Sequence, residues 1–246
     1  MQLMWIMVFS ILGSVGGLTG AALFLLFPER MRRFLVPCLI SYASGALLGA
    51  AFLGLIPHAL ERADAHSVLA TVLVGIVLFF ALEKLVLWRH CHDEECEVHG
   101  VAGPLILIGD AFHNFTDGVV IAGAFLSSFP LGVATALAVI AHEIPQEVGD
   151  FAILLEDGYT PRRAYLYNAL SSLSTLPGAI LAYFFLSQMQ MAISYILALS
   201  AASFIYIATA DLIPSLHREF GLGASVRQFL LMLAGIGTII LFHFHG

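Results

Sequence analysis

The stretch DAFHNFTDGVVIAGAF, residues 110–125, places charged and polar groups inside a segment that is otherwise apolar. The segment extends over residues 102–127, which is long enough to cross the hydrocarbon core of a bilayer as one helix. Within eight positions it carries Asp110, His113, Asn114 and Asp117. A charged group at membrane depth needs a partner, so this stretch predicts a membrane-spanning helix that carries a functional site.

The composition of the chain indicates an integral membrane protein. Of the 246 residues, 60% are hydrophobic and 11% are charged, and the mean hydropathy is +0.94. Such a chain has too little polar surface for a soluble domain of this size. Continuous apolar runs without period-two alternation favour helices over a β-barrel. No basic cluster indicates a nucleic-acid partner, and three cysteines are too few for a disulfide framework.

Eight apolar spans joined by short connections predict an all-α, polytopic membrane protein. The first span is expected to stay on the chain and not to act as a signal peptide, because no basic region precedes it. Residues 1–246 are therefore expected to form a single transmembrane domain with one longer loop at 89–101. The expected spans are 3–27, 34–58, 68–88, 102–127, 131–155, 162–187, 191–214 and 228–245.

The basic residues predict how the chain is oriented. Nine of the ten lie in the odd-numbered loops or next to them, and Arg62 alone lies in an even-numbered loop. Because basic loops stay in the cytoplasm, the odd-numbered loops are expected to be cytoplasmic and both termini extracytoplasmic. The expected location is the cell (inner) membrane.

A weak internal sequence similarity predicts an inverted repeat. The segment SYASGALLGAAFLGLIPHAL (41–60) aligns without a gap on ALSAASFIYIATADLIPSLH (198–217), with LIP matched to LIP. These are the second and seventh spans, which run in opposite directions. The pattern is typical of transporters whose substrate site lies between the repeats. The expected plan is spans 1–3 and 6–8 arranged around spans 4 and 5.

A second polar stretch, AVIAHEIPQEVGDFAILL (138–155), lies in the fifth span. Residues four apart share a helix face, so His142 shares a face with Gln146, and Glu143 with Glu147. Asp150 follows one turn further along. Spans four and five are joined by a short loop, and antiparallel packing would turn their polar faces toward each other.

The cost of burying these acids indicates a bound cation. Five carboxylates in the two spans would cost about 12–18 kcal/mol on insertion scales if nothing compensated their charge. Neither span contains Lys or Arg. His, Asp, Glu, Asn and Gln without a basic partner form a ligand set for a divalent metal ion. Pro145 also frees a backbone carbonyl, which is tolerable at membrane depth where it lines a wet cavity.

HNFTDG (113–118) and HEIPQE (142–147) resemble the paired signatures of the ZIP (Zrt/Irt-like) divalent-metal transporters, in the branch whose fifth span reads H-E-x-P-H-E. The resemblance implies alternating-access transport of divalent metal ions, with Zn²⁺ uptake into the cytosol and no cofactor. It also implies a homodimer. A first metal would contact His113, Asp117, His142 and Gln146. A second would contact Asn114, Asp117, Glu143 and Gln146, with Glu147 on the same face as Glu143.

The sequence departs from the family pattern at several positions. Gln146 is neutral where the family has Glu or His, and Thr175 lies where some members place a glutamate, so one metal is favoured over two. Spans two and seven retain fewer polar groups for a relay. The candidates for a relay or secondary site are Asp110, Asp150, His58 and Asp211.

Two features bear on the metal ion and its release. A site of His and carboxylate donors suits Zn²⁺, although Fe²⁺, Mn²⁺, Cd²⁺ and Co²⁺ accept similar ligands. The loop RHCHDEECEVHG (89–100) could capture released metal or be an ordinary solvated loop. Its candidate ligands are His90, Cys91, His92, Cys96 and His99.

Two other functions compete with transport. HEIPQ resembles the start of the H-E-x-x-H helix of zinc metalloproteases, which would make the chain an intramembrane enzyme. Gln146 stands in place of the second histidine of that motif, which argues against the enzyme. A passive metal channel or a sensor without net flux would need the same buried ligands as a carrier.

Overall fold

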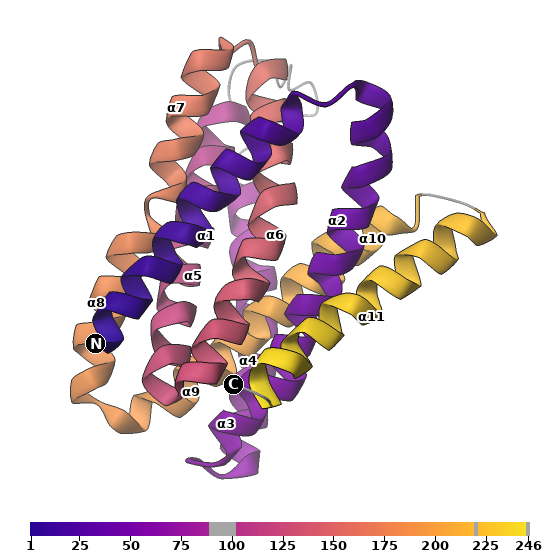
Figure 1. The fold of residues 1–246 in the computed structure, drawn as a ribbon. Helices are drawn as coiled ribbons and strands as arrows, with labels where there is room; N and C mark the ends of the chain where they lie inside the picture. The colour runs from indigo at the N-terminus through magenta and orange to yellow at the C-terminus, as the bar shows by residue number, and fades with distance from the viewer. Residues whose placement is uncertain (89–101, 219–220, 245–246) are drawn as a thin grey trace.

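The structure, a computed structural model, describes residues 1–88, 102–218 and 221–244. It confirms an all-α membrane protein (Figure 1). Six helical segments of the described part are long and apolar enough to cross a membrane, and α5 and α6 are as long but carry the polar stretches. The helices are α1 (Gln2–Leu25), α2 (Glu29–Gly49), η1 (Ala50–Leu55), α3 (Ile56–Leu60), α4 (Ala65–Trp88), α5 (Ala102–Ser127), α6 (Phe129–Glu156), α7 (Pro161–Ser172), α8 (Thr175–Gln188), α9 (Gln190–Tyr206), η2 (Ile207–Leu212), α10 (Ile213–Leu216) and α11 (Leu222–Phe244).

The expected spans correspond to these helices, with differences at their ends. The largest difference is in the last span, which begins at Leu222 and not at residue 228. Arg227 lies within this helix, and its guanidinium is 4.5 Å from the centre of the Phe34 ring. A cation–π contact stabilises a charged residue inside a helix, so the helix can extend past a charge at which the hydropathy pattern alone would place its end. The sixth span is also divided, because α7 ends at Ser172 and α8 begins at Thr175.

The second and seventh spans contain matching π-helices, which support the inverted repeat. η1 and η2 occupy the same positions of the internal alignment, and each is followed by an Ile-Pro pair. The N–H of Ile56 donates to the carbonyl of Ala51, and the N–H of Ile213 donates to the carbonyl of Ala208. Both are five-residue steps, which are rare in helices and common at functional sites. Figure 1 shows that α2 and α9 run in opposite senses.

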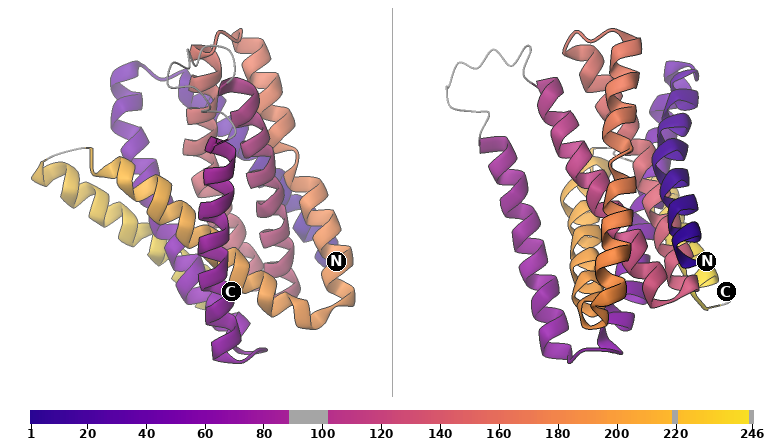
Figure 2. Two further views of the ribbon diagram at one scale, coloured as in Figure 1. Left: turned by 180° about the vertical axis from the view of Figure 1, so that it is seen from behind. Right: turned by 90° about the vertical axis from the view of Figure 1, so that its left-hand side faces the viewer.

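The helices pack most extensively in two groups (Figures 1 and 2). In the first group, α5 packs on α8 and α6, and α1 packs on α6. In the second, α2 packs along α11, and α4 packs along α9. Gly178 of α8 lies against the backbone of Phe115 in α5, where any Cβ would collide with the Phe115 carbonyl. Small residues permit such close approach of helices in a membrane. This contact holds the metal-motif segment of α5 against α8.

Candidate metal-binding site

Helices α5 and α6 are antiparallel neighbours that meet at Ser128 (Figure 1). The hydroxyl of Ser128 caps α6 by accepting a hydrogen bond from the N–H of Leu131. Midway along the two helices, the polar stretches face each other. Four of their side chains converge, and we call them the donor quartet: His113, Asp117, His142 and Glu143.

The donor atoms of the quartet lie close enough to share one ion. The Nε2 atoms of His113 and His142 are 3.0 Å apart. The Nε2 of His142 lies 3.2 Å from Oδ2 of Asp117 and 3.6 Å from Oε1 of Glu143. The Nε2 of His113 lies 3.6 Å and 3.4 Å from the same two oxygens. All four atoms fall within 4.8 Å of one another.

These separations agree with a tetrahedral zinc site. Zinc binds imidazole nitrogen and carboxylate oxygen at about 2.0–2.2 Å, so the edges of the tetrahedron are about 3.3–3.6 Å long. Five of the six distances between the donor atoms are 3.0–3.6 Å, in that range or slightly below it. A small ion at the centre would therefore reach all four atoms with little movement of the helices.

Hydrogen bonding orients His142 for a metal. Its Nδ1 lies 3.0 Å from the backbone carbonyl of Ala138, one turn earlier in α6. A carbonyl only accepts, so Nδ1 carries the proton and the lone pair of Nε2 faces the quartet. On the other side of α6, a Cβ on Gly17 of α1 would lie only 3.0 Å from the Cβ of Glu143. This close packing of α1 fixes the rotation of the Glu143 segment.

The quartet is buried and lacks compensating charge. Asp117, His142 and Glu143 are buried, and His113 retains 17% of its side-chain exposure. Both carboxylates have no hydrogen-bond partner in the part of the chain that the structure describes. Neither α5 nor α6 contains Lys or Arg. Buried carboxylates are stabilised by ion pairs, by protons or by metal coordination, so this arrangement can hold a divalent cation.

Gln146 and Asn114 form a separate network beside the quartet. The Nδ2 of Asn114 donates to Oδ1 of Asp110 at 2.8 Å, and Nε2 of Gln146 donates to the same oxygen at 3.4 Å. The Oδ1 of Asn114 accepts a hydrogen bond from Thr175 at 3.1 Å. The structure thus brings Glu143 to the two histidines and Asp117, whereas the sequence placed Gln146 there. A helix pattern alone could not decide this, because His142, Glu143 and Gln146 all lie on the half of α6 that faces α5.

Glu147 is buried and turned toward α7. Its Oε1 accepts a hydrogen bond from Ser172, and its backbone carbonyl accepts one from Nδ2 of Asn168 at 3.3 Å. Asp150 is half-buried, one turn further along α6. No sequence motif pointed to Ser172 or Asn168, since both lie in the sixth span outside the two signatures.

The other relay candidates belong to the second and seventh spans, on α3 and η2. His58 is near the end of α3, with Nδ1 3.1 Å from the carbonyl of Gly54 and Nε2 3.4 Å from the hydroxyl of Ser128. Asp211 is exposed in η2. The five candidate ligands of the 89–101 loop lie outside the described residues.

The site also touches the second helix group. The ring of Phe204, fully buried in α9, lies edge-on to His142 with 6.1 Å between ring centres. The donor quartet therefore lies where α9 of one group meets α6 of the other.

Comparison with known proteins finds zinc transporters that are similar to this chain. The sequence model of the ZIP zinc transporter family matches residues 87–243, which include both polar stretches. Among curated proteins, the chain is 34% identical to zinc transporter ZIP13 of Pongo abelii over 257 residues, covering 95% of this chain and 77% of that protein. It is 30% identical to the ZIP13 homolog of Drosophila melanogaster over 310 residues, covering 94% and 87%.

Another curated relative is matched over a smaller share of its own length. The alignment with zinc transporter zipt-7.2 of Caenorhabditis elegans is 31% identical over 262 residues. It covers 82% of this chain and 57% of the worm protein. The chain thus spans a little more than half the length of that relative.

Proposed function

We propose that this chain, which belongs to the ZIP zinc transporter family, carries divalent transition-metal ions across a membrane, with Zn²⁺ as the preferred cargo. The observation that carries the proposal is the donor quartet, in which two buried carboxylates without a hydrogen bond among the described residues and two imidazoles converge between α5 and α6. A metal ion there is cargo, so no resident cofactor is required.

The ligand set supports zinc over softer or harder ions. Two imidazole nitrogens and two carboxylate oxygens in a tetrahedral arrangement suit Zn²⁺. Fe²⁺, Mn²⁺, Cd²⁺ and Co²⁺ accept similar donors and are expected to compete. The quartet contains no thiolate, which disfavours Cu⁺. Competition for uptake by each of these ions measures the preference, and equal uptake of all would contradict it.

We assign one ion to the quartet in this conformation. Three polar residues then do not bind this ion directly: Asn114, Gln146 and Glu147. They orient the residues around it or bind the ion after the helices move. Asp110 and Asp150 extend this polar path along α5 and α6. His58 and Asp211 lie on the other helix group, where the ion would meet them before or after the quartet.

Movement between the two helix groups provides the access change. The quartet belongs to the group of α1, α5, α6 and α8. Phe204, which belongs to the other group, packs edge-on against His142. Sliding of one group past the other would move the quartet away from Phe204 and expose it to the opposite side. The inverted repeat supports such an exchange, because two halves of opposite orientation can adopt each other's conformation.

The topology that we propose follows the basic residues. A single domain comprising residues 1–246 places the odd-numbered loops in the cytoplasm and both termini outside, in the cell (inner) membrane. The 89–101 loop is then cytoplasmic, where its His and Cys residues would meet released metal. A homodimer is proposed from the family resemblance alone.

Radiometal uptake into proteoliposomes tests the transport proposal. We expect His142→Ala to reduce ⁶⁵Zn²⁺ uptake to below about a tenth of the wild-type rate, because the quartet loses a ligand. His66→Ala is the matched control, since His66 is exposed at the start of α4. Uptake by His142→Ala equal to that of the control would contradict the site assignment.

The same assay separates a carrier from a channel. Carrier flux saturates as external metal rises, whereas flux that keeps rising in proportion to the metal would indicate a channel. Metal binding without any flux would indicate a sensor. The metalloprotease alternative is set aside, because the family to which the chain belongs consists of transporters.

A further inference from the structure

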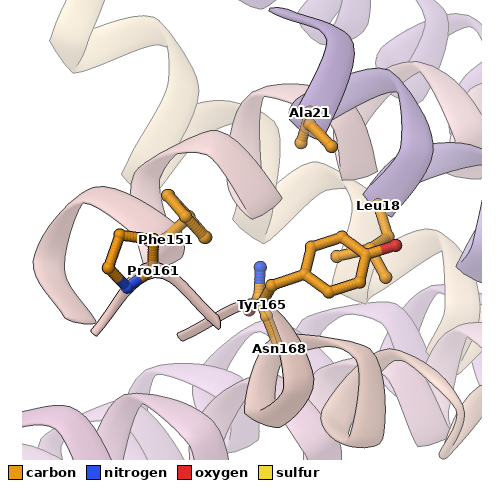
Figure 3. A pocket seen from close by; sticks show the side chains of 7 residues that line it. Leu18, Ala21, Phe151, Pro161, Tyr165 and Asn168 are labelled. Carbon is orange, nitrogen blue, oxygen red and sulfur yellow. The ribbon is translucent and has the colours of Figure 1, made fainter. Parts of the chain in front are cut away.

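An apolar cleft opens between α1, α6 and α7, away from the donor quartet. Its volume is about 270 Å³. Figure 3 shows the side chains around it, with the Tyr165 ring lying beside Leu18 and the Phe151 ring near Pro161. The lining residues that matter below are Leu18, Ala22, Phe151, Pro161, Tyr165 and Asn168.

The lining and size of the cleft suit hydrocarbon. Apart from the Asn168 amide and the Tyr165 hydroxyl, its walls are alkyl and aromatic groups. Closed apolar cavities stay dry in proteins, and this cleft of about 270 Å³ is larger than the roughly 150 Å³ that holds a benzene molecule. Since α1, α6 and α7 belong to the spans, the medium around the cleft is lipid. An acyl chain is therefore the occupant that the walls favour.

Two basic residues adjoin the cleft lining at the start of α7. Pro161 lines the cleft, and the exposed residues Arg162 and Arg163 follow it directly. They lie in the first turn of α7, a helix of 12 residues whose N-terminus is capped by the Thr160 hydroxyl. The partial positive charge of a helix N-terminus adds to that of the arginines. A phosphate group here would be attracted by both.

Asn168 connects the cleft to the helix that carries the metal motif. It is fully buried, and its Nδ2 donates to the Glu147 carbonyl of α6 at 3.3 Å. Its Oδ1 has no hydrogen-bond partner among the described residues. This polar corner suits the hydrated glycerol region of a lipid better than hydrocarbon alone.

We infer that this cleft is a binding site for one anionic phospholipid, with an acyl chain between α1, α6 and α7 and the phosphate at Arg162. The bound lipid contacts α1, α6 and α7 together, and all three belong to the helix group that contains the quartet or pack on it. Lipid binding here does not depend on metal transport, so its test stands apart from the uptake assay.

Native mass spectrometry of the full chain in detergent tests the site, with phosphatidylglycerol as the probe. We expect one phosphatidylglycerol to remain bound to the wild type and at least a tenfold weaker affinity in Ala22→Phe, whose ring fills the cleft. Ala81→Phe is the matched control, since Ala81 is an exposed alanine of α4. It should retain the lipid.

A second variant keeps the test independent of folding. Arg162→Gln changes only an exposed side chain, and we expect its preference for phosphatidylglycerol over phosphatidylcholine to fall by about fivefold, as for one basic group near a charged lipid. An unchanged preference, or equal binding by Ala22→Phe and wild type, would overturn the inference. Displacement of the lipid by inorganic phosphate alone would also overturn the inference. The same holds if Ala22→Phe loses dimers but keeps the bound lipid.

Discussion

Single residues decide how the site works, and α6 shows this at positions 142–146. His142 and Glu143 are both members of the donor quartet, while the side-chain amide of Gln146 donates a hydrogen bond to Asp110. The sequence identified these residues by type and spacing. It could not assign them to one ion, because the close packing of Gly17 against Glu143 depends on where α1 lies.

Asp117 contributes a charge that its neutral analogue cannot supply. Asp117→Asn keeps the shape of the side chain but removes a metal ligand, and we expect Zn²⁺ affinity to fall by at least about 100-fold. Isothermal titration of the detergent-purified protein measures it. Asp150→Asn, an acid outside the quartet, should stay within about threefold of wild type. Similar losses in the two variants would show that overall charge, and not the quartet, sets the affinity.

Gln146 limits the number of ions. In Gln146→Glu a carboxylate replaces the amide that now donates to Asp110, so two acids face each other without a proton between them. A second divalent ion would relieve this repulsion. We expect the metal-to-protein ratio, measured by inductively coupled plasma mass spectrometry, to rise from one toward two. Gln146→Asn should stay at one, and a ratio of one in both variants would count against the second position.

At the scale of helices, hydropathy predicted the spans and missed their internal breaks. The eight expected spans match the helices of the described chain, and the polar stretches lie on α5 and α6 as expected. η1 is apolar, η2 includes Thr209 and Asp211, and the break between α7 and α8 lies in the serine-rich stretch SSLSTLPG (171–178). Pro57 and Pro214 closely follow the two π-helices, and Pro177 follows the break, but a hydropathy average over a whole span does not register such positions.

Packing of α8 on α5 can be tested at a single glycine. In Gly178→Ala the added methyl group would collide with the Phe115 carbonyl, so we expect a loss of about 1–3 kcal/mol in stability. The matched control is Gly149→Ala, where nothing lies within 4 Å and alanine favours the helix by up to about 1 kcal/mol. Thermal unfolding in detergent compares them. A melting temperature that rises in both would mean that α5 and α8 are less tightly packed.

For the whole molecule, metal binding and proton binding are coupled. An imidazole binds metal only when neutral and a carboxylate only when ionised, so loading the quartet releases protons. We expect Zn²⁺ affinity to fall by at least about tenfold between pH 7.5 and pH 6, because protons then compete for the same donor atoms. Titrations at several pH values in buffers of different ionisation enthalpy measure the protons released. Affinity that is constant across this range would exclude the histidines as ligands.

The paired π-helices have a consequence for how the molecule changes shape. Both are wound with the same five-residue step in a single conformation, Ile56 to Ala51 and Ile213 to Ala208. If each repeat adopts the conformation of the other during a transport cycle, η1 and η2 exchange equivalent conformations, and neither needs to change its helical hydrogen-bond pattern. These turns would then be fixed pivots, and the difference between the two end states would reside in the contacts that α6 makes with α2, α9 and α11.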